Sequence, residues 1–186
     1  MYNGGIVGTV NSPSGSSADD SGVWGVNDVF YGIKELGSWG EVPRYFGSIG
    51  LFGGGYITAA TNVIDYVTIS TPSNATDFGD LTVARYGLAS CSNGVYGLFG
   101  GGYATSNANV IDYVTISTPS NATDFGDLTV ARQRLASCSN GVYGLFGGGY
   151  ATHNIIDYVT ISTPSNATDF GDLTVGRNGL ASCSGE

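Results

Sequence analysis

Short runs of β-branched and aromatic residues alternate with clusters of turn-forming residues along most of this chain. Residues 63–70 (VIDYVTIS) form such a run, and the cluster TPSNATD follows directly at 71–77. β-Branched and aromatic side chains favour extended strands, whereas Pro, Ser, Asn and Asp favour turns. The pattern therefore predicts a strand over 63–70 that ends in a tight turn.

Three further strands follow the same alternation. Residues 77–84 (DFGDLTVA) predict a short strand interrupted at Gly79, and residues 85–92 (RYGLASCS) predict the next. Asn-Gly then stands at Asn93, before the strand predicted over 95–102 (VYGLFGGG). Because Asn-Gly favours two-residue hairpin turns, the last two strands are expected to pair as a hairpin.

The same pattern repeats along the chain. The heptapeptide GLFGGGY begins at Gly50, Gly97 and Gly144, so its copies are 47 residues apart. Four strands in about 47 residues match the size of one β-propeller blade. The expected fold is therefore all-β, with an N-terminal segment followed by three four-stranded repeats, at residues 1–49, 50–96, 97–143 and 144–186.

Three blades are fewer than the roughly four to eight of an ordinary closed propeller. An open row of blades leaves strand edges and apolar faces exposed. Two alternative arrangements would cover these edges and faces. Subunits associate, so that two chains complete six blades, or the three repeats close on a pseudo-threefold axis as in a β-prism or β-trefoil lectin.

Composition agrees with an all-β chain and excludes several classes of protein. Glycine accounts for 31 of 186 residues and charged residues for 11%, which disfavours a helical bundle, while 41% hydrophobic residues allow a core.

The net charge is −9, and no Lys/Arg cluster is present. Nucleic acid and anionic membrane surfaces are therefore not expected partners. The N-terminal sequence has no signal-peptide pattern, and no apolar run approaches the length of a membrane span.

The order of residues within a repeat resembles the kelch repeat, which implies propeller blades. Phe takes the place of the usual Trp, so the match is kelch-like. The residues that carry the resemblance in one register are Arg85, Asn93, Gly94, Tyr96, Phe99, Gly100, Gly101, Asp112, Tyr113 and Phe125. The sequence NATDFGDLTVAR followed by FGGGY further resembles repeats of virion and tail-fibre-like proteins of marine tailed bacteriophages.

The N-terminal segment contains a Ser/Gly/Asp linker at 13–21, and its apolar spacing predicts a short helix over 27–36, capped by Asn27 or Asp28. This segment resembles the N-termini of phage tail-fibre and related virion proteins, on the residues Gly5, Ile6, Ser21, Gly22, Val23, Trp24, Asp28 and Trp39. The resemblance implies a non-enzymatic structural protein, made in the host cytoplasm and located in the virion. It would dock on other virion proteins through Trp24, Phe30, Ile33 and Trp39.

The repeats differ from one another mainly in and beside the expected loops. Rigid strands that carry variable loops are a common design for binding surfaces, although drift at unconstrained positions gives the same pattern. Tyrosines near the glycine triplets can stack on sugar rings of a host-surface glycan. The candidate binding residues are Tyr56, Ile57, Tyr86, Tyr103, Ser106, Asn107, Gln133, Arg134, Tyr150, His153 and Asn178.

Repeated polar residues admit structural and functional interpretations. Arg85, Arg132 and Arg177 recur near pairs of aspartates, which predicts ion pairs with Asp77/Asp80 and their copies, or aspartates that accept turn amides. A Ca²⁺ site made by Asn74, Asp77 and Asp80 is the functional interpretation, although calcium prefers six to eight oxygen ligands. The glycine triplets are interpreted as packing positions where blades meet. Cys91, Cys138 and Cys183 recur at one position and are expected to stay unpaired as small buried residues.

No catalytic site, metal or cofactor is expected. Three copies of the same carboxylates do not suit a glycosidase centre, which is usually unique. A copper oxidase on a propeller needs several His, Tyr and Cys ligands, and His153 is the only histidine in the sequence. Blades of this kind also occur in glycan-active propeller enzymes and in cellular kelch adaptors, and these two classes are less favoured here than a virion protein. A homo-oligomer is expected, a trimer by analogy with phage fibres or a dimer by the number of blades.

Overall fold

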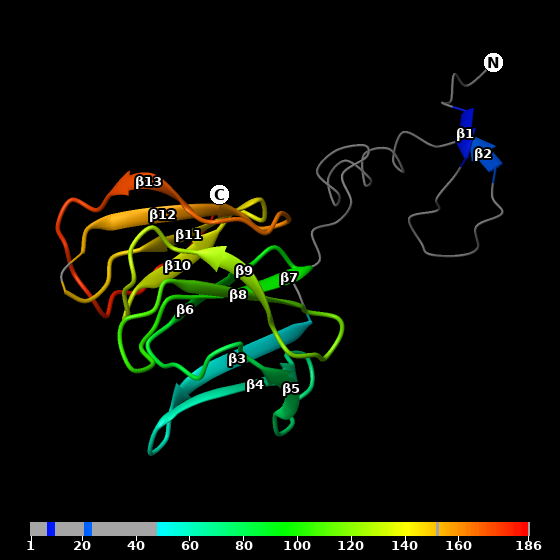
Figure 1. Ribbon diagram of the computed structural model, residues 1–186. Coiled ribbons are helices and arrows are strands. Elements are labelled where there is room, and N and C mark those ends of the chain that lie inside the picture. Colours follow the sequence, from blue (N-terminus) through cyan, green and yellow to red (C-terminus); the bar gives the residue numbers. More distant parts are fainter. Residues whose placement is uncertain (1–6, 10–20, 24–47, 152, 186) are drawn as a thin grey trace. The chain divides into compact units, whose positions relative to one another are not determined.

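The computed structural model describes residues 7–9, 21–23, 48–151 and 153–185 (Figure 1). Contacts divide the chain into two compact units, residues 1–45 and residues 46–186. In the first unit, β1 (Val7–Thr9) pairs antiparallel with β2 (Ser21–Val23), so Ser21 belongs to a strand and not to the expected linker. The helix expected over 27–36 and the docking residues Trp24, Phe30, Ile33 and Trp39 lie outside the described residues.

The second unit contains three antiparallel sheets. The first consists of β3 (Ile49–Tyr56), β4 (Ala60–Thr68) and β5 (Thr76–Asp80). The second consists of β6 (Ala89–Ser92), β7 (Tyr96–Gly100), β8 (Val110–Thr115) and β9 (Thr123–Asp127). The third consists of β10 (Ala136–Ser139), β11 (Tyr143–Gly147), β12 (Ile155–Thr160) and β13 (Thr168–Asp172).

The all-β prediction is confirmed, since the described part of the chain contains no helix. The strands of each sheet pair in chain order, and no sheet closes on itself. Figure 1 shows β6–β9 lying between the other two sheets. Four strands are found in two of the three sheets. The first sheet has three, because no described strand pairs with β3 in the place that β6 takes beside β7.

The expected hairpin turn joins β6 and β7. The side-chain oxygen of Asn93 accepts hydrogen bonds from the backbone N–H groups of Val95 at 3.0 Å and Tyr96 at 2.8 Å. Gly94 has a φ of 86°, a left-handed conformation that favours glycine. Cys91 is therefore placed opposite Leu98, and Ala89 opposite Gly100.

The interruption expected at Gly79 is a β-bulge, and the same bulge occurs at Gly126 in the second sheet. The register of the sheet shifts between Ile111 and Asp112, where Gly126 and Asp124 are the opposing partners. Gly126 has a φ of 141°, a backbone conformation that the side chain of another residue rarely permits. The first and third sheets contain the same shift, at Ile64 and Ile156.

The hydrophobic core lies between successive sheets. Ile64, Phe78 and Leu81 of the first repeat pack against Phe99 and Val114 of the second sheet. Their counterparts form the next cluster, which contains Ile111, Phe125, Leu128, Phe146 and Val159. Burial of each of these side chains contributes about 1.5–3 kcal/mol. Each sheet therefore depends on its neighbours for burial of its faces.

The glycine triplets confirm the packing interpretation. A Cβ atom on Gly53 would lie 2.7 Å from the Phe99 ring, and one on Gly100 would lie 2.6 Å from the Phe146 ring. Gly101 has a φ of 67°, and the carbonyl of Arg132 approaches it from the next segment of the chain. The sheets come this close because no side chain stands between them.

Candidate functional site

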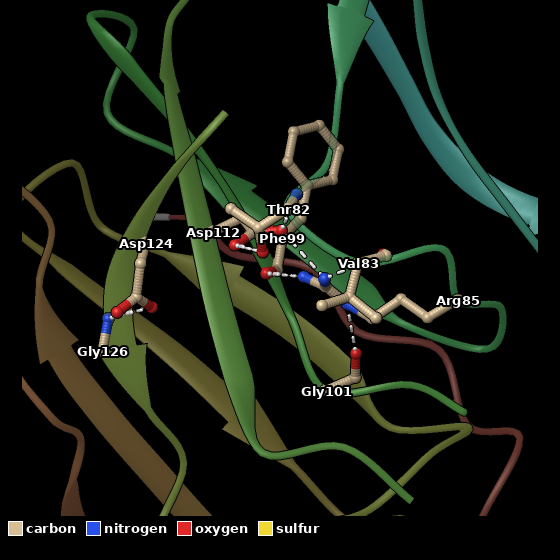
Figure 2. A network of polar contacts seen from close by, with 8 residues as sticks. All are labelled: Thr82, Val83, Arg85, Phe99, Gly101, Asp112, Asp124 and Gly126. Carbon is tan, nitrogen blue, oxygen red and sulfur yellow. Dashed lines mark hydrogen bonds and ion pairs between the residues drawn. The ribbon is translucent and has the colours of Figure 1, made fainter. Parts of the chain in front are cut away.

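Two repeated features could support a function: a buried arginine between sheets and a group of tyrosines at one end of the sheets. Arg85 lies in the segment between β5 and β6, and its side chain is fully buried. Its Nη1 lies 2.8 Å from Oδ2 of Asp112, which stands on β8 and is also fully buried (Figure 2).

The other two nitrogens of this guanidinium also donate hydrogen bonds. Arg85 Nε donates to the carbonyl of Gly101 at 2.9 Å, and Nη2 donates to that of Phe99 at 3.1 Å. Asp112 in turn accepts from the backbone N–H of Thr82 at 3.0 Å and from its hydroxyl at 2.6 Å (Figure 2). Burial of an ion pair is tolerated when both partners are hydrogen-bonded as fully as this.

The same arrangement recurs one repeat later. Arg132 Nη1 lies 2.8 Å from Asp157 Oδ2, and Thr129 supplies the same two hydrogen bonds to this carboxylate. The predicted pairing of these arginines with Asp77/Asp80 and their copies is wrong. The true partner stands on the next sheet, where a single Asp interrupts an apolar strand and requires a buried cation. That interruption is the sequence signal that could have identified the partner.

The aspartates after the turn have the other predicted role, since two of them accept backbone amides. Asp124 accepts from Gly126 N–H at 3.3 Å (Figure 2), and Asp169 accepts from Gly171 N–H at 3.0 Å. The copies of Asn74 contact the preceding sheet. Asn121 accepts from Asp80 N–H at 3.1 Å, and Asn166 from Asp127 N–H at 3.0 Å. In the described part of the chain, no group of three or more His, Cys, Asp or Glu residues is suited to a metal ion.

The candidate binding residues gather at one end of the sheets. The loop after β7 and the segment before β6 meet there, because Gly100 pairs with Ala89. Tyr86 and Tyr103 exchange two backbone hydrogen bonds, of 3.1 and 2.8 Å. Their rings are 5.5 Å apart, and the Tyr86 ring is 5.2 Å from that of Tyr56, which belongs to the first sheet. We name this surface the tyrosine end, formed by Tyr56, Tyr86, Tyr103, Gln133 and Tyr150.

The third sheet extends the tyrosine end with different residues. Tyr150 N–H donates to the carbonyl of Gln133 at 2.8 Å. Gln133 is buried, and its side-chain Oε1 has no hydrogen-bond partner among the described residues. Arg134 is exposed and has a φ of 57°, and its N–H donates to the carbonyl of Gly87. Gly179 N–H donates to the Arg134 carbonyl, so the three repeats are joined at this end.

The other predicted binding residues occupy the same end. Tyr103 forms an isolated bridge with Asn107, and Ser106 is exposed in that loop. Ile57 is exposed beside Tyr56. His153 is half-buried, and its backbone N–H donates to Gly149. Asn178 is exposed in the segment before residues 181–184.

The cysteines are unpaired, as predicted, but they do not share one environment. Cys91 and Cys138 are half-buried, whereas Cys183 is exposed, so the prediction that all three are buried is wrong for Cys183. Burial, with a smaller contribution from the neighbouring Cys138, raises the pKa of the Cys91 thiol from 9.0 to about 12. Cys91 is therefore a neutral thiol at physiological pH.

Comparisons with known proteins add no family assignment: no model of a known protein family and no curated protein matches the chain. Among the described residues, no helix is long and apolar enough to cross a membrane.

Proposed function

We propose that this chain is a non-enzymatic structural protein of a bacteriophage virion, a tail fibre or a fibre-associated component. In this proposal its three sheets are kelch-like propeller blades, and the N-terminal segment docks on another virion protein. The tyrosine end is the surface that binds a host-surface glycan or a second virion protein. The resemblance of the repeats and of the N-terminal segment to virion proteins supports the location, and the geometry of the loops supports the binding role.

One observation carries the binding role: residues that vary between repeats meet at one end, where aromatic rings are exposed. Tyr56 is 65% exposed and Tyr150 is 49% exposed. Tyr86 joins Tyr56 to Tyr103 in a continuous aromatic row across two sheets. Aromatic rings with a polar tip suit the apolar faces and hydroxyl edges of sugars. The uncharged character of this row also suits a neutral ligand more than an ionic one.

Binding of the purified chain to whole host cells and to a panel of surface glycans tests this role. Tyr103→Ala is expected to weaken binding by about tenfold or more, the usual effect of truncating a central aromatic contact. Tyr143→Ala is the control, since Tyr143 is an exposed tyrosine at the start of β11, the opposite end of the sheet. Equal binding by both variants would contradict the role of the tyrosine end.

Mass spectrometry of purified virions tests the location. The protein is expected in particles at a fixed ratio to the tail proteins and is expected to remain after washing at high salt. Its absence from particles that infect normally would contradict a virion role without affecting the binding result.

A further inference from the structure

The contacts between neighbouring sheets occur twice in residues 46–186, once between the first and second sheets and once between the second and third. At each end of this row of three sheets, one half of the same contact is left without its partner. The ion pair shows this first. Arg177 is the third copy of Arg85, but its side chain is exposed. Asp65 is the counterpart of Asp112 in the first repeat, but it stands half-buried on β4, and no described residue pairs with its carboxylate. One end of the row thus presents a cation, and the other presents the matching anion.

The aromatic contact over glycine is divided in the same way. Phe99 and Phe146 are at most 3% exposed, because each ring lies against a glycine of the preceding sheet. Phe52, their counterpart on β3, is 65% exposed. At the opposite end, Gly147 is the counterpart of Gly53 and Gly100, and no aromatic ring of the described residues is near its Cβ position. The first sheet therefore has the ring, and the third sheet has the place for it.

The outer strands give a third example of a contact that is present between neighbouring sheets and incomplete at the end of the row. Phe78 and Phe125 are each 3% exposed, and the segments that contain Ala122 and Ala167 cover them. Phe170, on the outer strand of the third sheet, is 60% exposed. A Cβ on Gly79 or Gly126 would meet the backbone of the next sheet, whereas one on Gly171 would meet nothing within 4 Å.

The free edge of β3 lies next to a hollow. A cavity of about 170 Å³ lies between Ile49 and Leu51 of β3 and residues 90–92 of β6. In the second sheet, β6 fills the corresponding place beside β7, and Ser137 of β10 donates a hydrogen bond to the Ser90 carbonyl of β6. Residues 181–184 repeat the sequence ASCS of β6 and β10. They pair with no described strand, and Ser182 already donates to Ser137.

We infer that a second copy of this chain joins these halves, with residues 181–184 of one copy pairing with β3 of the other. The pairing of β6 with β7 gives the register: Ala181 opposite Gly53, Ser182 opposite Phe52, Cys183 opposite Leu51 and Ser184 opposite Gly50. In the same step Arg177 reaches Asp65, and Phe52 covers Gly147. Charge, shape and backbone pairing all complement one another at this interface.

Two copies complete the assembly. One chain cannot join its own ends without a ring of three sheets, whereas closed propellers usually contain about four to eight. Two copies give six sheets, and three copies give nine. The interface is head-to-tail, and such interfaces form rings when the rotation closes. This inference rests on the proposed propeller architecture and is independent of the virion role.

A designed disulfide tests the register. Leu51→Cys is introduced together with Cys91→Ala, which removes the nearest competing thiol. Directly opposed residues of an antiparallel pair lie about 4.5–5.5 Å apart at Cα, within disulfide range. Mild oxidation is expected to give one product at twice the chain mass of 19.1 kDa on a non-reducing gel. The same variant with Cys183→Ser is expected to remain at the mass of one chain.

Light scattering and sedimentation of variants without engineered thiols test the contacts. Phe52→Ser and Arg177→Met are each expected to weaken the dimer by about thirtyfold or more, as expected for loss of a buried ring or of one partner of a buried ion pair. Val95→Ser and Arg134→Met are the controls, since both residues are exposed outside this interface. They are expected to leave the dimer intact.

A monomer at micromolar concentration would overturn the inference, and so would a cross-link that persists without Cys183. A ladder of larger species would overturn closure of the ring. These readouts measure mass, so their failure would leave the glycan-binding proposal standing, and loss of binding in Tyr103→Ala would leave the dimer unaffected.

Discussion

The guanidinium of Arg132 lies 2.8 Å from the carboxylate of Asp157, and both side chains are fully buried. Their positions are 25 residues apart in the chain, so the pair fastens the segment before β10 to the centre of the third sheet. The carbonyl of Arg132 also accepts from Gly102 N–H of the preceding sheet. One residue therefore holds two sheets, with its backbone on one and its side chain on the other.

Loss of one partner of this pair is expected to be severe. Arg132→Met leaves the carboxylate of Asp157 buried without its cation, which costs about 3–5 kcal/mol of the free energy of unfolding. Urea unfolding followed by tyrosine fluorescence measures this loss. The double variant Arg132→Met/Asp157→Leu is expected to lose less than Arg132→Met alone, because it removes both charges. A larger loss in the double variant would show that the hydrogen bonds, and not the charges, dominate.

Substitution of two equivalent glycines distinguishes packing within the chain from the proposed packing between chains. Gly100→Ala places a methyl group against the Phe146 ring and is expected to cost about 1–3 kcal/mol of the free energy of unfolding. Gly147→Ala is the matched substitution, and the nearest atom to its Cβ is 3.7 Å away on Ile156. In a Phe52→Ser background it is expected to be nearly neutral, whereas in the natural chain it is expected to weaken the proposed dimer. Equal destabilisation by both substitutions in the Phe52→Ser background would contradict this account.

The raised pKa of Cys91 predicts a loss of stability at alkaline pH. Between pH 9.0 and about 12 the thiol ionises in the unfolded chain and stays protonated in the folded one. The folded state then binds more protons, so the free energy of unfolding falls as the pH rises through this range. Denaturation curves collected at several alkaline pH values measure the slope. Cys91→Ala is expected to reduce it, and an unchanged slope in that variant would assign the effect to other groups.

The hairpin turn gives a smaller and local prediction. Asn93→Ala removes the acceptor of two backbone N–H groups and is expected to cost about 1 kcal/mol of stability. Asn140→Ala in the next hairpin has the same contacts and is expected to have the same effect. The two effects are expected to add in the double variant, because the turns are in separate sheets. Thermal unfolding of the three variants provides the comparison.

The strands, the Asn-Gly turn and the packing role of the glycine triplets could be predicted from the sequence, because each depends on residues close together in the chain. The partner of Arg85 could not. Near-identical repeats offer Asp77, Asp80 and Asp112 as equally repeated carboxylates, and the sequence does not show whether a contact lies within a repeat or between repeats. The exposure of Cys183 was missed for the same reason, since its environment depends on a neighbouring sheet that the third repeat lacks within this unit.

The candidate loops were each predicted from the sequence. Their contact with one another at one end of the sheets was not. Tyr56 and Tyr86 are 30 residues apart in the sequence and become neighbours through the contact between the first two sheets. The unpartnered oxygen of Gln133 was also invisible, since burial of that side chain depends on the backbone bond between Gln133 and Tyr150. Variation between repeats pointed to Tyr86 and Gln133, whereas their place beside a glycine triplet pointed to Tyr56 and Tyr150.

In the proposed ring, the identical bonds between successive sheets make the number of subunits depend on the length of the chain. Removal of residues 97–143 deletes one whole repeat and rejoins Tyr96 to Gly144, as Tyr143 is joined to Gly144 now. Every remaining contact between neighbouring sheets keeps its own arginine, aspartate, phenylalanine and glycine. A ring of six sheets would then be divided among three shorter chains in place of two. Recombination between the near-identical repeats could thus alter stoichiometry, and with it the valency of binding, without a single new interface.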